Sequence, residues 1–280
     1  MKKTKLLIFI VAYNAEKTIQ SVINRIPKKL SKIYNLEVLI IDDCSQDRTF
    51  EISKKIKKNK NSVFKLNILY NLRNQGYGGN QKIGYHYAIK KNFDYVVLLH
   101  GDGQYAPEEL PKLMYELKKN KYDVVMGSRM IKKKNALKGG MPFYKLVGNI
   151  ILTTIQNFLL KTKLAEFHTG YRIYSINSLK NIPFHLNTND FHFDTEILIQ
   201  LFIVNSKIRE ISIPTFYGDE ICHVNGMKYA FDIIVTTLIA SLQNNLNLKL
   251  SNKYKKNNEK KKRYKNLSMD NLLIQARKRN

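Results

Sequence analysis

The sequence predicts an α/β fold in which a doubly wound, mostly parallel sheet is covered by helices on both faces. Two observations support this prediction. Over the first 130 residues, apolar runs of strand length alternate with segments of helical period, and each run ends in polar residues. The strands are expected at 6–12, 36–42, 65–70, 95–100 and 122–127, and the helices between them at 16–30, 47–58, 79–91 and 107–119.

Each expected strand is apolar along most of its length, as LLIFIVA at 6–12 and YVVLLH at 95–100 show. Continuous apolar runs of this kind are typical of strands that are buried on both faces of a parallel sheet. In such sheets, ligands bind beyond the carboxyl ends of the strands. The residues that carry chemistry are therefore sought directly after each run.

Beyond residue 130 the pattern changes to a Lys/Gly loop and then to segments that are expected to cap the sheet and shape an acceptor site. We expect one catalytic domain over 1–245, with a donor half at 1–130 and an acceptor half at 131–245. The Lys/Asn-rich stretch 246–280 is expected to be a flexible basic tail with at most one short helix at 268–276. The remaining elements are expected as helices at 144–160, 194–204 and 228–244 and a strand at 208–214.

Charge and cysteine content narrow the class of protein. The 280 residues include 48 basic and 22 acidic ones, a net charge of +26, which indicates an anionic partner such as nucleic acid, a membrane surface or a phosphorylated substrate. No apolar stretch reaches the roughly 20 residues of a membrane span, and the basic N-terminus leads into a strand rather than a signal peptide. Cys44 and Cys222 lie in no CxxC or Cys/His cluster, which excludes a zinc ribbon and favours a cytoplasmic protein.

The sharpest chemical signal is HGDGQ at 100–104, directly after the fourth expected strand. In an extended segment His100, Asp102 and Gln104 project to the same side, and the intervening glycines let a ligand come close. These groups can converge on a Mg²⁺ ion that also holds phosphate oxygens. The alternative is a glycine-rich turn that caps the following helix.

A second signal is IDDCSQDRT at 41–49. Asp42 and Asp43 end a buried strand, where unpaired carboxylates are costly unless they accept hydrogen bonds. The N–H of a base or the hydroxyls of a ribose would supply such bonds. The alternative is helix capping, in which Ser45 or Asp47 begins the next helix and the two acids satisfy turn amides.

Weaker signals follow the first strand. In VAYNAEKTI at 11–19, the strand end carries Ala12, Tyr13 and Asn14, and the first two are able to pack beside a base. Glu16 lies in the first helical turn, where the helix dipole favours a carboxylate in any case. On its own this segment identifies no ligand.

Two further strand ends suggest anion binding. The turn NQGYGGN at 74–80, which includes Gly76, opens a helix and could aim backbone amides at an anion. It matches neither GxGxxG nor a Walker loop, which argues against dinucleotides and phosphoryl transfer. Arg129, at the end of the fifth strand, could pair with a diphosphate in a forked geometry.

In series, these segments resemble family 2 glycosyltransferases with a GT-A fold, in the branch of dolichol-phosphate mannose synthases and bacterial polyprenyl-phosphate glycosyltransferases. The resemblance runs from Leu6 to Ala230 and rests on the order of the motifs. They are VAYNAEKTI, IDDCSQDRT, NQGYGGN, HGDGQYAPE, GSRM followed by GGMP, and EFHTGYRIYS.

The resemblance implies a nucleoside diphosphate sugar donor (UDP, GDP or dTDP) that contacts Asp42 or Asp43. It also implies Mg²⁺ or Mn²⁺ on Asp102 and Gln104, and phosphate on Arg129. One departure is His100, which stands where the family has its first acid. Either metal binding is weaker and shifted toward Mn²⁺, or His100 has another role and Asp102 anchors the ion alone.

Members of this branch resemble inverting enzymes, and their acceptor decides whether a protein base is needed. A lipid phosphate is already anionic, whereas a sugar hydroxyl must lose a proton to a carboxylate. The candidates are Glu166, Asp194 and Glu196, with helix-surface or capping charge as the alternative; Glu166 matches the family's acidic position before the TGYR segment. In that segment the resemblance assigns acceptor phosphate to Arg172.

The expected function is therefore metal-dependent sugar transfer to a polyprenyl-phosphate or related lipid-linked acceptor in cell-envelope glycan synthesis. The amphipathic helix after GGMP and the basic tail favour a location at the inner face of the cytoplasmic membrane. The alternative acceptor is a glycan hydroxyl, as in polysaccharide or lipopolysaccharide assembly. Nucleic-acid binding is disfavoured because the chain has no Trp and no aromatic–basic motif of an RNA-binding sheet.

Overall fold

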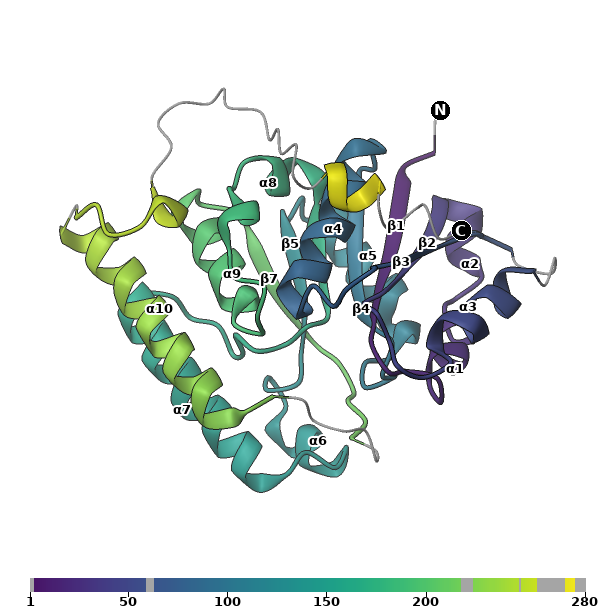
Figure 1. Ribbon diagram of the computed structural model, residues 1–280. Helices are drawn as coiled ribbons and strands as arrows, with labels where there is room; N and C mark the ends of the chain where they lie inside the picture. Colours follow the sequence, from purple (N-terminus) through teal and green to yellow (C-terminus); the bar gives the residue numbers. More distant parts are fainter. Residues whose placement is uncertain (1–2, 59–62, 218–223, 247, 256–269, 275–280) are drawn as a thin grey trace.

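A computed structural model describes residues 3–58, 63–217, 224–246, 248–255 and 270–274 (Figure 1). Its centre is a seven-stranded sheet with the order β3-β2-β1-β4-β6-β5-β7. The strands are β1 (Lys5–Ala12), β2 (Asn35–Asp42), β3 (Lys65–Tyr70), β4 (Tyr95–His100), β5 (Val124–Ser128), β6 (Arg172–Ser175) and β7 (Ile208–Ser212).

The sheet is mostly parallel, as predicted. Strand β1 pairs in parallel with β2 and β4, β2 with β3, and β5 with β7. The short strand β6 runs antiparallel between β4 and β5. It lies in the TGYRIYS segment, which the sequence pattern did not mark as a strand because only four residues are paired.

Helices cover both faces of the sheet, and alternate residues of β1 show why the strand is continuously apolar. Leu6, Ile8 and Ile10 pack into one core cluster, with α1 (Ile19–Asn24), α2 (Lys29–Ile33), α3 (Thr49–Lys58) and α5 (Leu110–Lys119). Leu7 and Phe9 pack into a second core cluster on the other face. That face is covered by α4 (Tyr77–Lys90), α8 (Ile176–Lys180) and α9 (Phe193–Ile203).

Three helices from the second half of the chain lie together at one side of the molecule (Figure 1). They are α6 (Lys133–Lys138), α7 (Phe143–Leu160) and α10 (Gly226–Leu246). Helix α10 contacts both α7 and α9, and the Ser241 hydroxyl donates a hydrogen bond to the carbonyl of Leu159 at 2.8 Å. Short 3₁₀ turns lie at Pro107–Glu109, Phe184–Leu186 and Asn252–Tyr254.

Two expectations differ from the structure. The single helix expected at 16–30 is two helices, α1 and α2, separated by a segment that contains Pro27, which lacks the N–H that a continuous helix requires. Parts of the tail that we expected to be flexible are packed against the fold, as the low exposure of Tyr254 (3%) and Leu273 (1%) shows. Residues 247, 256–269 and 275–280 of that tail lie outside the described residues. Within the described part of the chain, no helix is long and apolar enough to cross a bilayer.

Candidate active site

The carboxyl ends of β1, β2 and β4 meet at one edge of the sheet. The backbone N–H of Asp43 donates to the carbonyl of Ala12, and that of Gly101 to the carbonyl of Val11, both at 2.9 Å. Three of the five strand ends that carry predicted motifs are therefore held side by side. This edge is our candidate site.

The turns after β1 and β2 are locked to each other by side chains. The amide of Asn14 donates to the hydroxyl of Ser45, and the Asn14 side-chain oxygen accepts from the amide of Gln46, each at 2.9 Å. Glu16 accepts from the amide of Arg48 at 3.1 Å. Asn14 and Glu16 thus have structural partners, and Ala12 is buried, while Tyr13 is 37% exposed.

Asp42 and Asp43 are both buried at the tip of β2. Asp43 accepts from the side-chain amide of Asn71 at 2.7 Å and the backbone amide of Gln75 at 2.9 Å. Oδ1 of Asp42 accepts from the amide of Ser45 at 2.8 Å, but Oδ2 is buried and finds no hydrogen-bond partner among the described residues. Burial raises the pKa of Asp42 to about 6, against hydrogen bonds from Ser45 that lower it.

In the turn NQGYGGN, the amides of the three glycines are already paired within the protein. The amide of Gly76 donates to the side chain of Asn74 at 2.8 Å, and the amides of Gly78 and Gly79 donate to the carbonyl of Asn189. Gly76 has φ of 78°, and a Cβ there would lie 2.6 Å from that same carbonyl oxygen. The structure thus does not support the prediction that Gly76 binds an anion. Glycine is needed at this position because the turn has a positive φ and because the backbone of Asn189 lies close to it.

Asp102 lies at the tip of β4 with 38% of its side chain exposed. Oδ1 accepts from the amide of Gln104 at 2.9 Å, and Oδ2 lies 3.8 Å from Nδ1 of His100. Burial would raise the pKa of Asp102, but hydrogen bonding to His100 and the charges of His100 and Arg129 hold it below its ordinary value. The carboxylate is therefore ionised and open at neutral pH.

His100 is anchored from the opposite side of its ring. Nε2 lies 3.0 Å from the hydroxyl of Tyr77, which donates to the carboxylate of Asp194 at 2.8 Å. Because the single O–H of that hydroxyl donates to the carboxylate, its oxygen accepts a hydrogen bond from Nε2–H. The other nitrogen, Nδ1, thus faces Asp102. Sequence reasoning missed Tyr77, although it lies inside a motif that was singled out.

Arg129 and Glu166 form a buried ion pair. The guanidinium donates to the Glu166 carboxylate, to the carbonyl of His168 at 3.0 Å and to the hydroxyl of Tyr217 at 2.9 Å. Arg129 is 8% and Glu166 0% exposed. In this arrangement Arg129 offers no free forked face to a diphosphate, which differs from the sequence-based expectation.

The ion pair with Arg129 also makes Glu166 a poor candidate for the catalytic base. Burial raises the pKa of Glu166, but the charge and hydrogen bonds of Arg129 outweigh burial and lower it. The side-chain amide of Asn149 donates a further hydrogen bond at 3.0 Å. A carboxylate held ionised by these partners is a weak proton acceptor.

Arg172 also points inward. Its side chain has no exposed surface and donates to the carbonyls of Thr169, Asp194 and Phe167 at 2.7–2.8 Å. It lies 3.6 Å from the carboxylate of Asp194. Direct contact with an acceptor phosphate, as the resemblance implied, is not available to Arg172 in this structure.

Glu196 lies apart from the strand tips. It is 2% exposed and accepts hydrogen bonds from the ammonium of Lys253 at 2.6 Å and from the amide of Thr188. None of these partners is a predicted site residue. The buried pairing explains the residue without a catalytic role.

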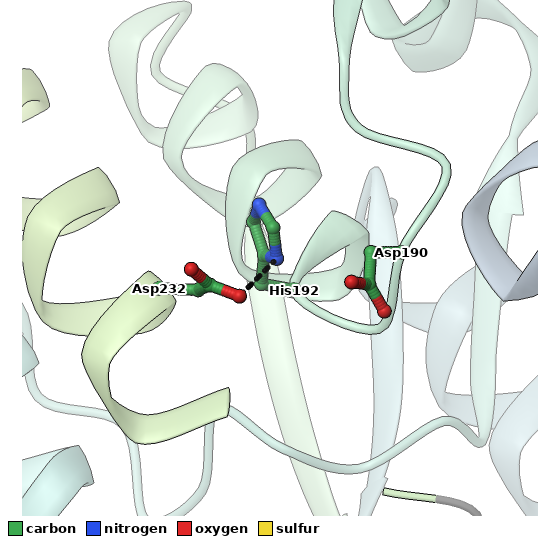
Figure 2. A group of neighbouring side chains, drawn as sticks. All are labelled: Asp190, His192 and Asp232. Carbon is green, nitrogen blue, oxygen red and sulfur yellow. Dashed lines mark ion pairs between the residues drawn. The ribbon is translucent and has the colours of Figure 1, made fainter. Parts of the chain in front are cut away.

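A second acidic group was missed by sequence reasoning because its members come from two distant segments. Asp190, His192 and Asp232 each offer a ligand atom within 4.8 Å of the others, and Figure 2 shows His192 beside Asp232. The ammonium of Lys228 contacts both carboxylates, at 2.7 and 3.1 Å. Within the described residues this is the group with metal-ligand spacing, but a lysine already neutralises much of its charge.

The fold is that of a GT-A glycosyltransferase. Glucosyl-3-phosphoglycerate synthase from Mycobacterium tuberculosis, solved with UDP, superposes with a TM-score of 0.61 at 18% identity, over 84% of this chain and 79% of that one. A further structure of that enzyme, with Mn²⁺, UDP-glucose and phosphoglyceric acid, gives 0.61 at 16% identity, over 85% and 79%.

The sequence comparison identifies the family. Residues 7–182 match the family described as Glycosyl transferase family 2, and the chain belongs to it. A UDP-N-acetylglucosamine–dolichyl-phosphate N-acetylglucosaminyltransferase of Methanococcus voltae is 30% identical, over 77% of this chain and 87% of its own. A polyprenol monophosphomannose synthase of Mycolicibacterium smegmatis is 22% identical, over 79% and 80%. The chain is a glycosyltransferase with relatives in the polyprenyl-phosphate branch.

Proposed function

We propose that this enzyme transfers a sugar, with inversion, from a nucleoside diphosphate sugar to a polyprenyl phosphate or related lipid-linked phosphate. The choice of a phosphate acceptor rests on one observation: each of the three carboxylates considered as a catalytic base is already in an ion pair. Glu166 pairs with Arg129, Asp194 with Arg172, and Glu196 with Lys253. An acceptor that is already ionised requires no such base.

The donor nucleoside is assigned to the tip of β2. Oδ2 of Asp42 is a buried acceptor with no partner among the described residues, and a buried polar atom in that state costs about 1–3 kcal/mol. An N–H or O–H of a nucleoside would satisfy it once the turn at Ser45, which covers the carboxylate, moves aside. Tyr13, exposed on the neighbouring strand end, supplies an aromatic surface for the base. The relatives' names favour UDP, with GDP and dTDP as alternatives.

The donor diphosphate is assigned to the tip of β4. An open, ionised carboxylate on Asp102, an amide on Gln104 and an imidazole nitrogen on His100 suit Mg²⁺ or, given the nitrogen, Mn²⁺. Such an ion, when bound, would neutralise the charge that develops on the leaving diphosphate. His100 is held for this role by Tyr77, in the way that an outer partner orients a metal-binding imidazole.

A glycan hydroxyl is the second candidate acceptor, because the donor site would be the same. Incubation with a radiolabelled nucleotide sugar and undecaprenyl phosphate separates the two. We expect label in the butanol phase as a product that mild acid releases. Label found only on added saccharides would overturn the lipid-phosphate acceptor and leave the donor assignment standing.

A lipid-phosphate acceptor implies where in the cell the enzyme works. A polyprenyl phosphate presents its head group at a bilayer surface, so we propose that the enzyme works as a peripheral protein at the inner face of the cytoplasmic membrane. Its net charge of +26 supports this location, because anionic lipids attract basic proteins.

A further inference from the structure

Two adjacent helices carry apolar side chains that the described part of the chain leaves exposed. Helices α7 and α10 pack against each other and run side by side along one flank of the molecule (Figure 1). We call their outward apolar side chains the α7/α10 face. On α7 these are Phe143, Tyr144, Val147, Ile151 and Phe158, and on α10 Met227, Phe231, Leu238, Leu242 and Leu246.

The spacing shows that these side chains form stripes. Most lie three, four or seven positions apart, so each set follows one side of its helix. The exposure is large, reaching 83% for Phe158, 85% for Met227 and 67% for Phe231. Large apolar side chains that are exposed together along two adjacent helices indicate an interaction site.

The charges around the α7/α10 face identify its partner. Residues 131–165 contain seven lysines and no acidic residue. Lys132, Lys133, Lys134 and Lys138 are exposed in and beside α6, which contacts α7, and Lys161 and Lys163 are exposed just beyond its far end. Between Lys145 and Lys161, α7 itself has no charged residue, nor has α10 between Asp232 and Leu246.

We infer that the α7/α10 face lies in the interfacial layer of an anionic bilayer. Apolar side chains would enter the acyl boundary while the lysines at both ends meet anionic head groups. A second copy of this chain would instead bring two identical lysine-rich rims together, and like charges repel. The charge pattern therefore favours a lipid surface over self-association.

The position of the α7/α10 face relates it to the catalytic edge. Tyr229, near the start of α10, contacts His168 through its hydroxyl at 3.2 Å, and the carbonyl of His168 accepts from Arg129. The start of α10 is thus tied to the acceptor half of the site. Membrane binding on this face would hold that half at the lipid surface, an inference that rests on the proposed lipid-phosphate acceptor.

Vesicle flotation tests the inference without donor or acceptor. The probes are vesicles of phosphatidylcholine alone and of phosphatidylcholine mixed with phosphatidylglycerol. We expect the wild type to float with the anionic vesicles, and Phe158→Glu/Phe231→Glu to weaken this partitioning roughly tenfold or more. The charge-neutral pair Phe158→Ser/Phe231→Ser should also weaken it, because the lost contacts are apolar.

The matched control is Ile33→Glu/Tyr115→Glu, which makes the same charge change at exposed apolar residues, 56% and 58%, on α2 and α5. It should float as the wild type does. Equal flotation of Phe158→Glu/Phe231→Glu and the wild type, or no wild-type flotation, would overturn the inference. So would a wild-type dimer that these two substitutions dissociate in sedimentation equilibrium. Flotation by an enzyme that fails on lipid phosphate would leave this surface standing and overturn only the acceptor.

Discussion

The Nδ1 atom of His100 faces Oδ2 of Asp102 at 3.8 Å, while the far side of the ring is fixed by Tyr77. The imidazole nitrogen therefore lies at the strand tip, at the position where the family has a carboxylate oxygen. If Asp102 anchors the metal, this relationship determines how His100 contributes. Substitutions at Tyr77 and at His100 itself separate a metal-binding role from a purely structural one.

Tyr77→Phe removes the hydroxyl that orients His100 and keeps the ring that stacks on Phe191. Loss of an outer partner of a metal-binding histidine costs roughly 10- to 100-fold in metal affinity. We therefore expect weaker activation by Mn²⁺, together with a modest fall in melting temperature because Asp194 also loses a hydrogen bond. An unchanged Mn²⁺ activation curve would show that His100 does not act on the metal.

His100→Asp restores an oxygen ligand at the strand tip. Because Mg²⁺ prefers oxygen and Mn²⁺ accepts nitrogen more readily, the ratio of activity with Mg²⁺ to activity with Mn²⁺ should rise. Initial rates in each metal measure this ratio. A ratio equal to that of the wild type would argue that Asp102 anchors the ion without help from residue 100.

Glu166→Gln tests whether the residue is structural or a base. It leaves the guanidinium of Arg129 buried without a charged partner, so we expect about 3 kcal/mol less stability in urea unfolding. Arg129→Met/Glu166→Met, which removes both charges, should recover much of that loss. A Glu166→Gln enzyme of wild-type stability that has lost its activity would instead support the role as a base.

The raised pKa of Asp42 leads us to expect a specific pH dependence of the free energy of unfolding. Burial raises its pKa from 3.8 to about 6, so the folded state holds this proton more tightly than the unfolded chain does. The resulting stabilisation is complete below the unfolded pKa and is lost as pH rises through the folded one. It amounts to about 3 kcal/mol.

The measurement is urea unfolding of the wild type and of Asp42→Asn at several pH values. Asparagine keeps an oxygen that can accept from Ser45 but does not titrate. The stability difference between the two proteins should change between about pH 4 and 6. A difference that stays constant over this interval would contradict the raised pKa. Weaker nucleotide binding by Asp42→Asn would further support the nucleoside assignment.

Much of the fold could be predicted from the sequence because its signals are local. Strands buried on both faces give continuous apolar runs, and the rule that ligands bind at their carboxyl ends led to Asp42, Asp43 and Asp102. The structure brings these three acids to one edge of the sheet. Strand β6 was missed because a four-residue strand carries too little pattern.

The partners of the buried charges could not be predicted in the same way. Arg129 and Glu166 are 37 positions apart, and Arg172 and Asp194 are 22 apart, so neither pairing appears in any local motif. Motifs identified these residues as polar and well placed, but only tertiary packing shows that their charges are already matched. The group of Asp190, His192 and Asp232 was missed for the same reason.

We propose that a divalent ion on Asp102 holds the donor diphosphate. Mn²⁺ titration followed by electron paramagnetic resonance, in the presence of whichever of UDP, GDP or dTDP raises the melting temperature most, tests it directly. Asp102→Asn should weaken Mn²⁺ binding at least tenfold, since it removes the charged ligand, and His192→Ala should bind as the wild type does. Wild-type Mn²⁺ affinity in Asp102→Asn, or its loss in His192→Ala, would place the ion elsewhere and contradict the account.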